Sequence, residues 1–558
     1  MDITSRLESI IKDAANMVAK AESLDSVSNI IIEAPKDKKL ADLSTNIAMQ
    51  LCKSQKALKP FDIAESITKY IKESLSSEKL NEYFSLLEVK HPGFINFHFS
   101  DSYLQSVIED IKKQKNLFGK SNIGNGKKIL LEYVSANPTG PLSVAHGRQA
   151  AIGDALSNIL KFAGYKVTDE YYLNDEGNQI ELLGLSIHAR YCELLGEEQP
   201  FPETGYKGQY IYDIAKSMVD KHKTALTEDV SKNIDIFCEF GVKYLLDSIK
   251  KDLKDFGVDF DNYFSQATLS SSNKIDKALK LLKDKGFLYE EEGALWFRST
   301  DFSDDKDRVL RKSDGSYTYI TPDIAYHNDK FKRGFDTLID MWGPDHHGYI
   351  ARIKAACKAL DWDDNNLSIL IVQLVTLSRD GVPIKMSTRE GKFVTLREVI
   401  DEVGKDVARF FFLMRRKDSH LDFDLELAKK ESMENPVYYI QYAHARICGI
   451  LEHKKEHDIK PAKKEDFALL NTPEELNVLK LLHDFPTIIE ICAQSYEPHK
   501  LISYLMELAS SFHSFYAKHR VVGDDTHLMS ARLGLIEALK SVFLQSLSLL
   551  GVSSPEKM

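Results

Sequence analysis

Paired cysteines are missing from this sequence. Its 558 residues include six cysteines, which stand singly and form no Cys-x-x-Cys motif. Such spacing disfavours both a disulfide framework and a cysteine-rich zinc site. We therefore expect reduced thiols that are mostly buried, and no metal site.

An excess of positive charge and long apolar runs are also missing. The formal net charge is −11, the wrong sign for a protein that coats nucleic acid non-specifically, although a locally basic groove is compatible with it. No apolar run approaches the roughly 20 residues that span a bilayer. The start of the chain, MDITSRLESIIKDAANMVAK, lacks the basic residues and apolar core of a signal peptide. These absences predict a cytoplasmic protein that does not bind membranes.

The composition that remains suits a globular protein of several domains. With 43% hydrophobic and 28% charged residues and a length beyond what one core usually organises, about three domains are expected. Residues 1–118 are predicted to form an α+β module. Its predicted elements are a helix at about 3–22, a strand at 30–34, helices at 44–54 and 61–77, and an alternating strand at 93–99.

From residue 119 onward the pattern changes to strand, loop, helix and strand, which is typical of a parallel α/β sheet. KKILLEYVSA (127–136) and YKVTDEYYL (165–173) are predicted to be buried strands. The helix between them has apolar residues three and four apart and ends at Gly164. This order predicts a Rossmann-type catalytic domain with a parallel sheet.

The predicted catalytic domain covers 119–428 and carries insertions between about 175 and 300. Its other predicted elements are helices at 208–222, 233–255 and 273–286, hairpins at 288–298 and around the SDGS turn of 313–316, and buried strands within 337–349 and 367–378. Residues 429–558 have a helical pattern throughout. They predict an all-α bundle as the C-terminal domain.

Polar clusters follow three of the predicted strands, at 132–146, 174–179 and 343–347. In an open parallel sheet, ligands bind beyond the carboxyl ends of the strands. His146 stands where a helix begins, and the free N–H groups of a helix N-terminus suit phosphate. Taken alone, His146 is equally well explained as a first-turn residue in a Pro/Gly-rich turn.

A basic cluster, GVPIKMSTREGKF (381–393), lies in a Gly-flanked loop after a later strand. By itself it is best explained as an exposed turn. Together with the first cluster it resembles the paired signatures of class I aminoacyl-tRNA synthetases, written HIGH and KMSKS. These signatures stand here at Ser143–His146 and Lys385–Arg389.

Further strings narrow the resemblance to the bacterial arginyl-tRNA synthetases. In the order of that family the sequence has EYVSANPTGPL and then HGR, YYLNDEGNQI, GYKGQYIYDIA, YTYITPDIAYHNDKF, WGPDHHGY, ARFFFLMRRKDSHLDFDL, NPVYYIQYAHARI and LLGVSSPEKM. Each string alone has little specificity. The ordered set is highly specific and extends over essentially the whole chain.

The resemblance implies an enzyme that activates L-arginine with ATP. Arginyl-adenylate and pyrophosphate form first, and the arginyl group then passes to the 2′-hydroxyl of the terminal adenosine of the tRNA for arginine. Catalysis of this kind depends mainly on positioning and on stabilising the charge of the phosphates. The resemblance further implies Mg²⁺ carried by ATP, no tightly bound metal, and a monomer.

The arginine site follows from the resemblance by position. Glu132 and Asn137 match residues that hold the amino acid. Tyr319 and Asp323 match the pair that contacts the guanidinium, a planar fork suited to a carboxylate and an aromatic face. Without the resemblance, Glu132 would be interpreted as an exposed strand-end charge. Tyr319 would be hairpin packing, and Asp323 a helix N-cap after Pro322.

The ATP site is implied in the same way. The residues assigned to ATP are Ser143, His146, Gly343, Asp345, His346, Lys385 and Met386, and those assigned to catalysis are Ser143, His146, Lys385 and Arg389. The adjacent His346 and His347 could suggest a metal pair. Neighbouring histidines do not easily share a metal, and no third ligand stands at a suitable spacing.

The RNA-binding residues are expected among the C-terminal aromatics. Aromatic and Arg planes stack on splayed single-stranded bases. The candidates for the anticodon are Tyr438, Tyr442, Arg446, Phe515, Tyr516 and Arg520. Core packing would explain about half of them equally well. In the N-terminal module, Lys36, Lys38 and Lys39 could meet tRNA phosphates or form a solvated loop.

The sequence departs from both signatures. Ser143 replaces the first His and Ala145 the Gly of HIGH, while Thr388 replaces the second Lys of KMSKS. Some relatives with the last change carry a lysine before the histidine signature, but this chain has Gly140 there. Our hypothesis is that Lys385, with Arg389 or Lys392, supplies the charge that neutralises the triphosphate.

Two other functions fit parts of the sequence. The replaced signature residues would suit a catalytically impaired RNA-binding paralogue of the same fold, although the arginine-site residues Glu132, Asn137, Tyr319 and Asp323 are intact. A nucleotidyltransferase of the same superfamily that acts on a small molecule is disfavoured by the long helical C-terminal region.

Overall fold

The computed structural model describes residues 3–27, 30–35, 37, 40–54, 58–227, 230–384, 393–456 and 459–558. The chain forms two compact units. The first comprises Met1–Phe118, Ile450–Asp484 and Ser511–Ser541, and the second comprises Gly119–Gly449, Phe485–Ser510 and Val542–Met558. Both units therefore include part of the helical region that begins at about residue 430.

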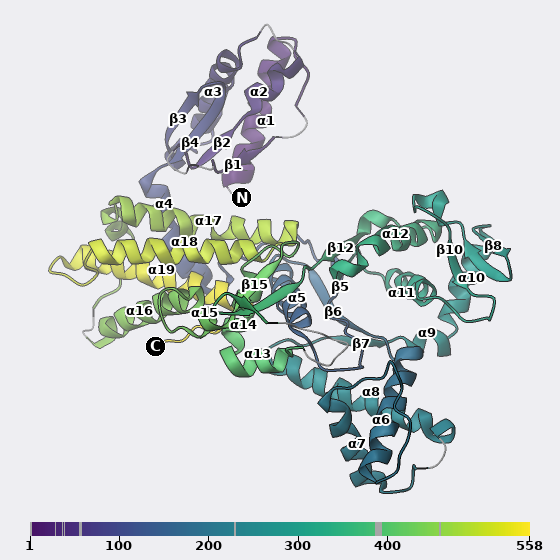
Figure 1. The fold of residues 1–558 in the computed structure, drawn as a ribbon. Coiled ribbons are helices and arrows are strands. Elements are labelled where there is room, and N and C mark those ends of the chain that lie inside the picture. The colour runs from purple at the N-terminus through teal and green to yellow at the C-terminus, as the bar shows by residue number, and fades with distance from the viewer. Residues whose placement is uncertain are drawn as a thin grey trace. The chain divides into compact units, whose positions relative to one another are not determined.

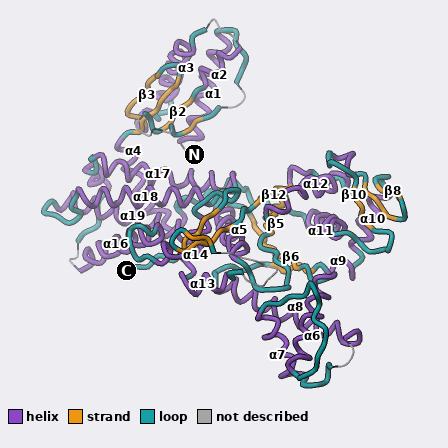
Figure 2. The backbone as a smooth tube through the Cα atoms, in the orientation of Figure 1, coloured by secondary structure: helices purple, strands orange, loops and turns teal. Residues whose placement is uncertain are grey.

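An antiparallel sheet of order β1-β2-β4-β3 forms the N-terminal part of the first unit; its strands are orange in Figure 2. The strands are β1 (Ile32–Glu33), β2 (Leu43–Thr45), β3 (Phe84–Lys90) and β4 (Phe94–Phe99), and the helices are α1 (Ile3–Ala21), α2 (Ile47–Leu51), α3 (Pro60–Ser77) and α4 (Asp101–Gln114). Helices α1, α2 and α3 share one apolar core with β4. The predicted α+β character of this module is confirmed.

The predicted helix at 44–54 is wrong at its start. Ser44 and Thr45 belong to β2 and pair with Asn96 and Ile95 of β4. The Ser44 hydroxyl also donates to Asn96 Oδ1 at 2.7 Å. Pairing with a distant strand therefore decides the conformation of these residues. Strand β3, which the sequence analysis did not predict, completes the sheet.

The second unit is built on a five-stranded sheet of order β12-β11-β5-β6-β7. All four strand pairs are parallel, which confirms the predicted Rossmann-type sheet. The strands are β5 (Lys128–Glu132), β6 (Lys166–Leu173), β7 (Asn262–Ser265), β11 (Thr337–Trp342) and β12 (Leu367–Ile371).

Helix α5 (Val144–Phe162) follows β5 and packs closely against the end of that strand. A Cβ atom on Gly153 would lie 2.2 Å from the ring of Tyr133, so only glycine fits there. As predicted, the helix ends just before Gly164, whose φ of +90° suits glycine. This close packing sets the N-terminus of α5 beside the carboxyl end of the sheet.

The stretch from 175 to 300 contains a helical lobe, shown in Figure 1 as α6, α7 and α8. These helices are α6 (Asn178–Leu194), α7 (Gln209–His222) and α8 (Val230–Asp255), and they enclose a core of their own. Helix α6 was not predicted. Strand β7 then returns to the main sheet, so the predicted insertion is interrupted by a sheet strand.

The polypeptide after β7 forms a smaller antiparallel sheet of order β10-β9-β8. Its elements are α9 (Ala267–Ser271), α10 (Lys274–Asp284), β8 (Leu288–Glu291), β9 (Ala294–Phe297) and β10 (Arg308–Arg311). The predicted turn at 313–316 is present, with Gly315 at φ +85°. The strand expected after it is reduced to one bridge between Arg311 and Tyr317.

The rest of the second unit up to residue 429 contains a third sheet of order β14-β13-β15. Its elements are α11 (Ile320–Lys332), α12 (Ile350–Ala359), β13 (Val375–Arg379), β14 (Val382–Pro383), α13 (Leu396–Val403), α14 (Lys405–Leu413), β15 (Leu421–Asp424) and α15 (Leu425–Lys429). The short 3₁₀ helices of the chain lie at Cys52–Ser54, Asn81–Tyr83, Lys115–Leu117, Ser299–Phe302, Pro344–Tyr349, Asp364–Asn366 and Lys464–Leu469.

The C-terminal region is helical, as predicted. Its helices are α16 (Pro436–Glu456), α17 (Pro473–Ser495), α18 (His499–Lys518) and α19 (Thr526–Leu550). By length and composition α19 alone among the described helices could cross a membrane, although its apolar residues do not form one uninterrupted run. Within the protein, 67% of its apolar window is buried. This burial is typical of a helix in a protein core.

Candidate active site

Three carboxylates form a row across the carboxyl end of the main sheet. Asp340 of β11 is aligned with Glu132 of β5, and Glu132 is aligned with Glu170 of β6. Aligned residues of neighbouring parallel strands point to the same face of the sheet. None of the three is more than 6% exposed. Buried carboxylates are costly unless they are paired, so this row requires cations.

Helix α11 supplies the cations for Glu132 and Asp340. Lys330 is fully buried, and its Nζ donates both to Glu132 Oε2 and, at 2.7 Å, to Asp340 Oδ1. His327, one turn earlier, has Nε2 at 2.9 Å from Asp340 Oδ2. Its Nδ1 lies 2.8 Å from the main-chain oxygen of Asp323. Both ring nitrogens therefore face acceptors.

The third carboxylate of the row is held by Arg333, which follows α11. The Arg333 guanidinium donates to both Glu170 oxygens, at 2.6 and 2.8 Å. The hydroxyl of Tyr326 donates to Glu170 at 2.7 Å, and the side-chain amide of Asn262 donates at 2.6 Å. Glu170 is therefore fully engaged within the fold.

These partners were not predicted, although the sequence contains a signal for them. Acidic residues interrupt two apolar strands, in TLIDMW and VTDEYYL. His327, Lys330 and Arg333 recur every three residues along or just after one helix, a spacing that places side chains on one face. Neither pattern indicates which acid meets which base, because that depends on strand register.

The charges of this cluster depend on one another. Burial raises the pKa of Glu132, and Lys330 offsets part of that rise. Burial alone would also raise the pKa of Asp340, but Lys330 and His327 outweigh it and lower the value to about 2. Lys330 itself keeps a raised pKa, because Asp340 and Glu132 outweigh the effect of its burial. Lys330 is therefore a buried ammonium group shared by two carboxylates.

A strained turn follows Glu132 directly. Val134 and Ser135 have φ values of +68° and +40°, which are unfavourable for side-chain-bearing residues and above all for a β-branched one. The turn brings the Ser135 hydroxyl back to donate to Glu132 Oε1 at 2.9 Å. The Ser135 hydroxyl oxygen in turn accepts the main-chain N–H of Tyr172 at 3.0 Å. Lys330 bonds to Oε2 of Glu132, and the strained turn places Ser135 where it can bond to the other oxygen, Oε1.

Tyr319 and Asp323 lie one helical turn apart at the start of α11. Tyr319 is the N-cap residue and is 72% exposed, so the alternative of hairpin packing is wrong. Asp323 is half-buried, and Tyr349 donates its hydroxyl to Asp323 Oδ2 at 2.7 Å. Burial raises the pKa of Asp323, and this hydrogen bond offsets part of the rise. Among the described residues no basic side chain forms an ion pair with Asp323.

Asn137 connects two of the predicted polar clusters. Its side-chain amide donates to Gln179 Oε1 at 2.8 Å. Asn137 is exposed and Gln179 lies in the first turn of α6. The loops after β5 and β6 therefore meet, as expected for neighbouring parallel strands.

Ser143 and His146 bond to each other at the start of α5. Ser143 is the N-cap residue, and its main-chain N–H donates to His146 Nδ1 at 3.1 Å. The Ser143 hydroxyl lies 3.2 Å from the same nitrogen. Because Nδ1 accepts a hydrogen bond, the neutral ring carries its proton on Nε2. Burial lowers the pKa of His146 to about 4, so Nε2–H is the donor that remains at neutral pH.

Since His146 is neutral in the folded protein and protonates more readily when unfolded, acid should destabilise the fold through this residue. The stabilisation is complete above the unfolded pKa of about 6.5 and is lost as the pH falls toward 4. Between pH 7 and pH 5 we expect the wild type to lose about 2 kcal/mol more of its unfolding free energy than His146→Gln. Urea unfolding at the two pH values measures this difference. Equal losses in both proteins would contradict an imidazole that stays neutral in the folded protein.

The third predicted cluster forms the 3₁₀ turn Pro344–Tyr349 after β11. Gly343 is half-buried, while Asp345 and His346 are exposed. Among the described residues there is no group of three metal-ligating side chains. The predicted residues Lys385, Met386, Arg389 and Lys392 lie outside the described residues, as do Thr388, Lys36, Lys38 and Lys39.

The predicted RNA-binding aromatics differ in their surroundings. Tyr438 and Tyr442, on α16, are half-buried and stack with their ring centroids 6.1 Å apart and planes within 8°. The Arg446 guanidinium lies 4.9 Å from the Tyr442 ring. Of the candidates on α18 and just after it, Phe515 is fully buried, whereas Tyr516 and Arg520 are exposed. Phe515 is therefore a core residue and not a base platform.

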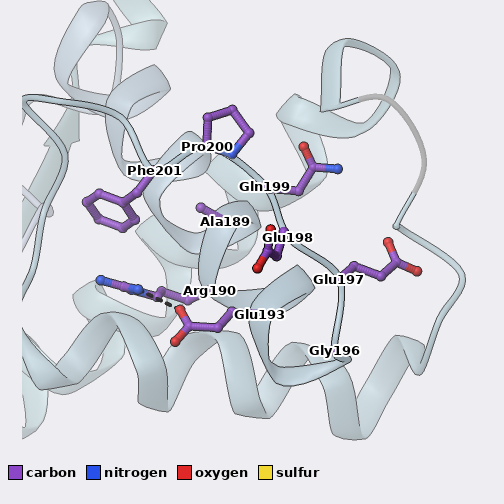
Figure 3. A pocket seen from close by; sticks show the side chains of 9 residues that line it. All are labelled: Ala189, Arg190, Glu193, Gly196, Glu197, Glu198, Gln199, Pro200 and Phe201. Carbon is purple, nitrogen blue, oxygen red and sulfur yellow. Dashed lines mark hydrogen bonds and ion pairs between the residues drawn. The ribbon is translucent and has the colours of Figure 1, made fainter.

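An open pocket of about 630 Å³ lies in the helical lobe and contains none of the predicted site residues. Figure 3 shows Arg190 beneath the ring of Phe201 and paired with Glu193. The Arg190 guanidinium lies 4.3 Å from the Phe201 ring and 4.5 Å from the Tyr212 ring. The aromatic and acidic side chains here are therefore already occupied by an arginine of the chain itself.

Comparison with known proteins agrees with this architecture along the whole chain. Residues 4–99 match the arginyl-tRNA synthetase N-terminal domain, residues 107–433 the catalytic domain of class I tRNA synthetases (R), and residues 440–558 the DALR anticodon-binding domain. An arginine–tRNA ligase of Bacillus subtilis (strain 168) is 46% identical, with 100% of each chain covered. The chain belongs to the arginyl-tRNA synthetases. An arginine–tRNA ligase of Geobacter sp. (strain M21) is 48% identical over 95% of each chain.

A solved structure shares the synthetase fold at much lower identity. The arginyl-tRNA synthetase of Thermus thermophilus has a TM-score of 0.75 and 20% identity, with 99% of this chain and 100% of that chain covered. The multidomain class I fold of this synthetase is therefore the one expected from its sequence.

Proposed function

We propose that the protein attaches L-arginine to its tRNA at the expense of ATP. One observation carries the choice of amino acid. Asp323 is a half-buried carboxylate with no ion-pair partner among the described residues, and the exposed ring of Tyr319 stands one helical turn before it. A carboxylate and an aromatic face are the groups that recognise a planar guanidinium.

In this proposal the two cationic ends of arginine go to different carboxylates. Asp323 and Tyr319 take the guanidinium, and Glu132 takes the α-ammonium group, with Asn137 nearby as a further polar contact. Glu132 uses one oxygen for Lys330 and the other for Ser135. A carboxylate has about four acceptor positions, so it retains capacity for the substrate.

ATP binds at the N-terminus of α5 in this proposal. His146 Nε2–H donates to a phosphate, while Ser143 acts through His146 and not as a separate phosphate ligand. Gly343, Asp345 and His346, with Met386, border the adenine and ribose. Mg²⁺ arrives with ATP, and no tightly bound metal takes part.

The reaction proceeds in two steps. An oxygen of the arginine carboxylate attacks the α-phosphorus, a new O–P bond forms, and the bond to pyrophosphate breaks with its electron pair leaving on pyrophosphate. The 2′-hydroxyl of the terminal adenosine then attacks the carbonyl carbon of arginyl-adenylate. AMP departs, and the hydroxyl proton passes to solvent. The enzyme contributes position and charge stabilisation.

The proposed tRNA contacts are aromatic and arginine side chains of the C-terminal helical region. Tyr438 and Tyr442 form a half-buried stack that Arg446 extends, and such a stack is suited to a splayed base. Arg520 is exposed and suited to phosphate or base stacking. We further propose that the protein works as a monomer in the cytoplasm, without binding a membrane.

The charge of the missing second signature lysine is assigned to Lys385, with Arg389 or Lys392. Alanine at each position should slow tRNA-dependent pyrophosphate exchange, because the triphosphate would lose a neutralising charge. Exchange assays of the three single variants measure this. Wild-type rates in all three would refute the assignment.

The overall function is tested by aminoacylation of total tRNA with each of the twenty amino acids. Charging with arginine alone supports the proposal. Binding of tRNA without charging would instead indicate the catalytically impaired RNA-binding paralogue.

A further inference from the structure

Lys330 has no role in the proposed substrate contacts, yet its charged group is buried beside a residue that does. It is fully buried, and its Nζ lies between two carboxylates that are neighbours in the strand register, Glu132 and Asp340. The ring of Tyr326 closes the site 4.3 Å from the same nitrogen. All four groups come from three different elements: β5, β11 and α11.

Without a cation between them, these two carboxylates could not both stay ionised. Adjacent parallel strands lie about 4.8 Å apart, and two buried acids at that spacing repel, so that one of them takes up a proton. Of the two, Glu132 is the one whose pKa is already raised by burial, whereas that of Asp340 is lowered. Loss of the Lys330 charge would therefore neutralise Glu132 first.

We propose that Lys330 is a positioning residue, which keeps the Glu132 carboxylate ionised and correctly oriented for the α-ammonium group of arginine. This inference rests on the proposed function. Lys330 holds Oε2 of Glu132, and Ser135 holds Oε1. The carboxylate is thus fixed from two sides while its remaining acceptor positions stay open to a ligand.

The test uses steady-state arginylation by the full-length protein with Lys330→Met, Glu132→Gln and the double variant. At pH 7, K330M should raise the KM for arginine about 10- to 100-fold, the range expected for losing a hydrogen bond to a charged group. The KM for ATP should stay within threefold. As a matched control, Lys161→Met removes another lysine paired with a buried carboxylate, Asp169 at 2.7 Å, and should leave the KM for arginine unchanged.

Two further readouts separate positioning from a merely structural role. In the Glu132→Gln background, Lys330→Met should add little, because both changes act through one carboxylate. The defect of K330M should also shrink as the pH rises from 6.5 to 9, because a higher pH favours the ionised form of a carboxyl group whose pKa is raised. The titratable groups around Glu132 and Lys330 that could respond to the same change include Asp323, His327, Asp340, Glu170, Tyr172, Tyr326 and Cys357, and Tyr349 acts on this set through Asp323. The wild type, which contains all of them, serves as the reference profile.

If K330M fails to fold, Lys330→Met combined with Asp340→Asn removes the cation together with one of its two carboxylates and preserves the net charge. A raised KM for arginine is expected there as well, because Glu132 still loses the bond from Lys330 that orients its carboxylate. An unchanged KM, effects that multiply fully in the E132Q background, or a defect independent of pH would each overturn the inference. If the wild type charges no arginine, the proposed function itself fails. If E132Q raises the KM and K330M does not, only the inference about Lys330 fails.

Discussion

Asp323→Asn should lower kcat/KM for arginine at least about a hundredfold, because the variant loses a charge-assisted bond to the guanidinium. Asn keeps the size of the side chain and its acceptor for the Tyr349 hydroxyl, so the local fold should persist. The KM for ATP and the affinity for tRNA should change little. Arginylation kinetics with each substrate varied in turn measure the effect.

A matched control for this variant lies on the same helix. Asp329, six residues further along α11, pairs with Lys274 at 2.8 Å and has no part in the proposed site. Asp329→Asn should leave kcat/KM for arginine within about twofold, because Asp329 pairs with Lys274 and Arg333 and with none of the residues proposed to bind arginine. If D323N and D329N behave alike, Asp323 does not bind the guanidinium.

Arg409→Met should cost about 3–5 kcal/mol of unfolding free energy, the range for breaking a buried ion pair. Arg409 is fully buried in α14 and donates to Asp154 of α5. It also donates to the main-chain oxygen of Leu550 at 3.0 and 3.2 Å and to that of Phe256 at 3.2 Å. The variant would leave the half-buried carboxylate of Asp154 and two carbonyls without this donor.

Urea unfolding measures that loss, with Arg379→Met as the control. Arg379 also pairs with carboxylates, those of Glu402 and Glu426, but its side chain is 47% exposed. Water can replace its partners, so its removal should shift the midpoint far less. Similar shifts for the two variants would mean that the hydrogen bonds of Arg409, which connect α14 to α5 and to the end of α19, contribute little to stability.

Several elements could be predicted because their signals are local. The apolar strand before Glu132, the helix that ends before Gly164 and the turn at Gly315 each depend on residues close in sequence. The predicted helix over 44–54 was wrong at its start because Ser44 pairs with Asn96 of a distant strand. Tertiary pairing outweighs local preference in such short segments.

The candidate site divides in the same way. Motif order alone was enough to propose Glu132, Asn137, Tyr319 and Asp323 as the arginine site. It could not predict that Ser143 would bond to His146 at the helix cap, since that contact depends on how the chain enters α5. A serine at that position therefore has a structural explanation.

The sequence by itself determined the family, the parallel α/β domain and the residues proposed to meet arginine and ATP, because these are carried by motifs and by apolar periodicity. Only the tertiary structure decided which charges neutralise one another. The alignment of β5 with β6 and β11 places three acids side by side, and the packing of α11 on that face brings Lys330 between two of them. Strand register and helix packing join residues far apart in the chain, and the energy of a buried charge depends on those neighbours.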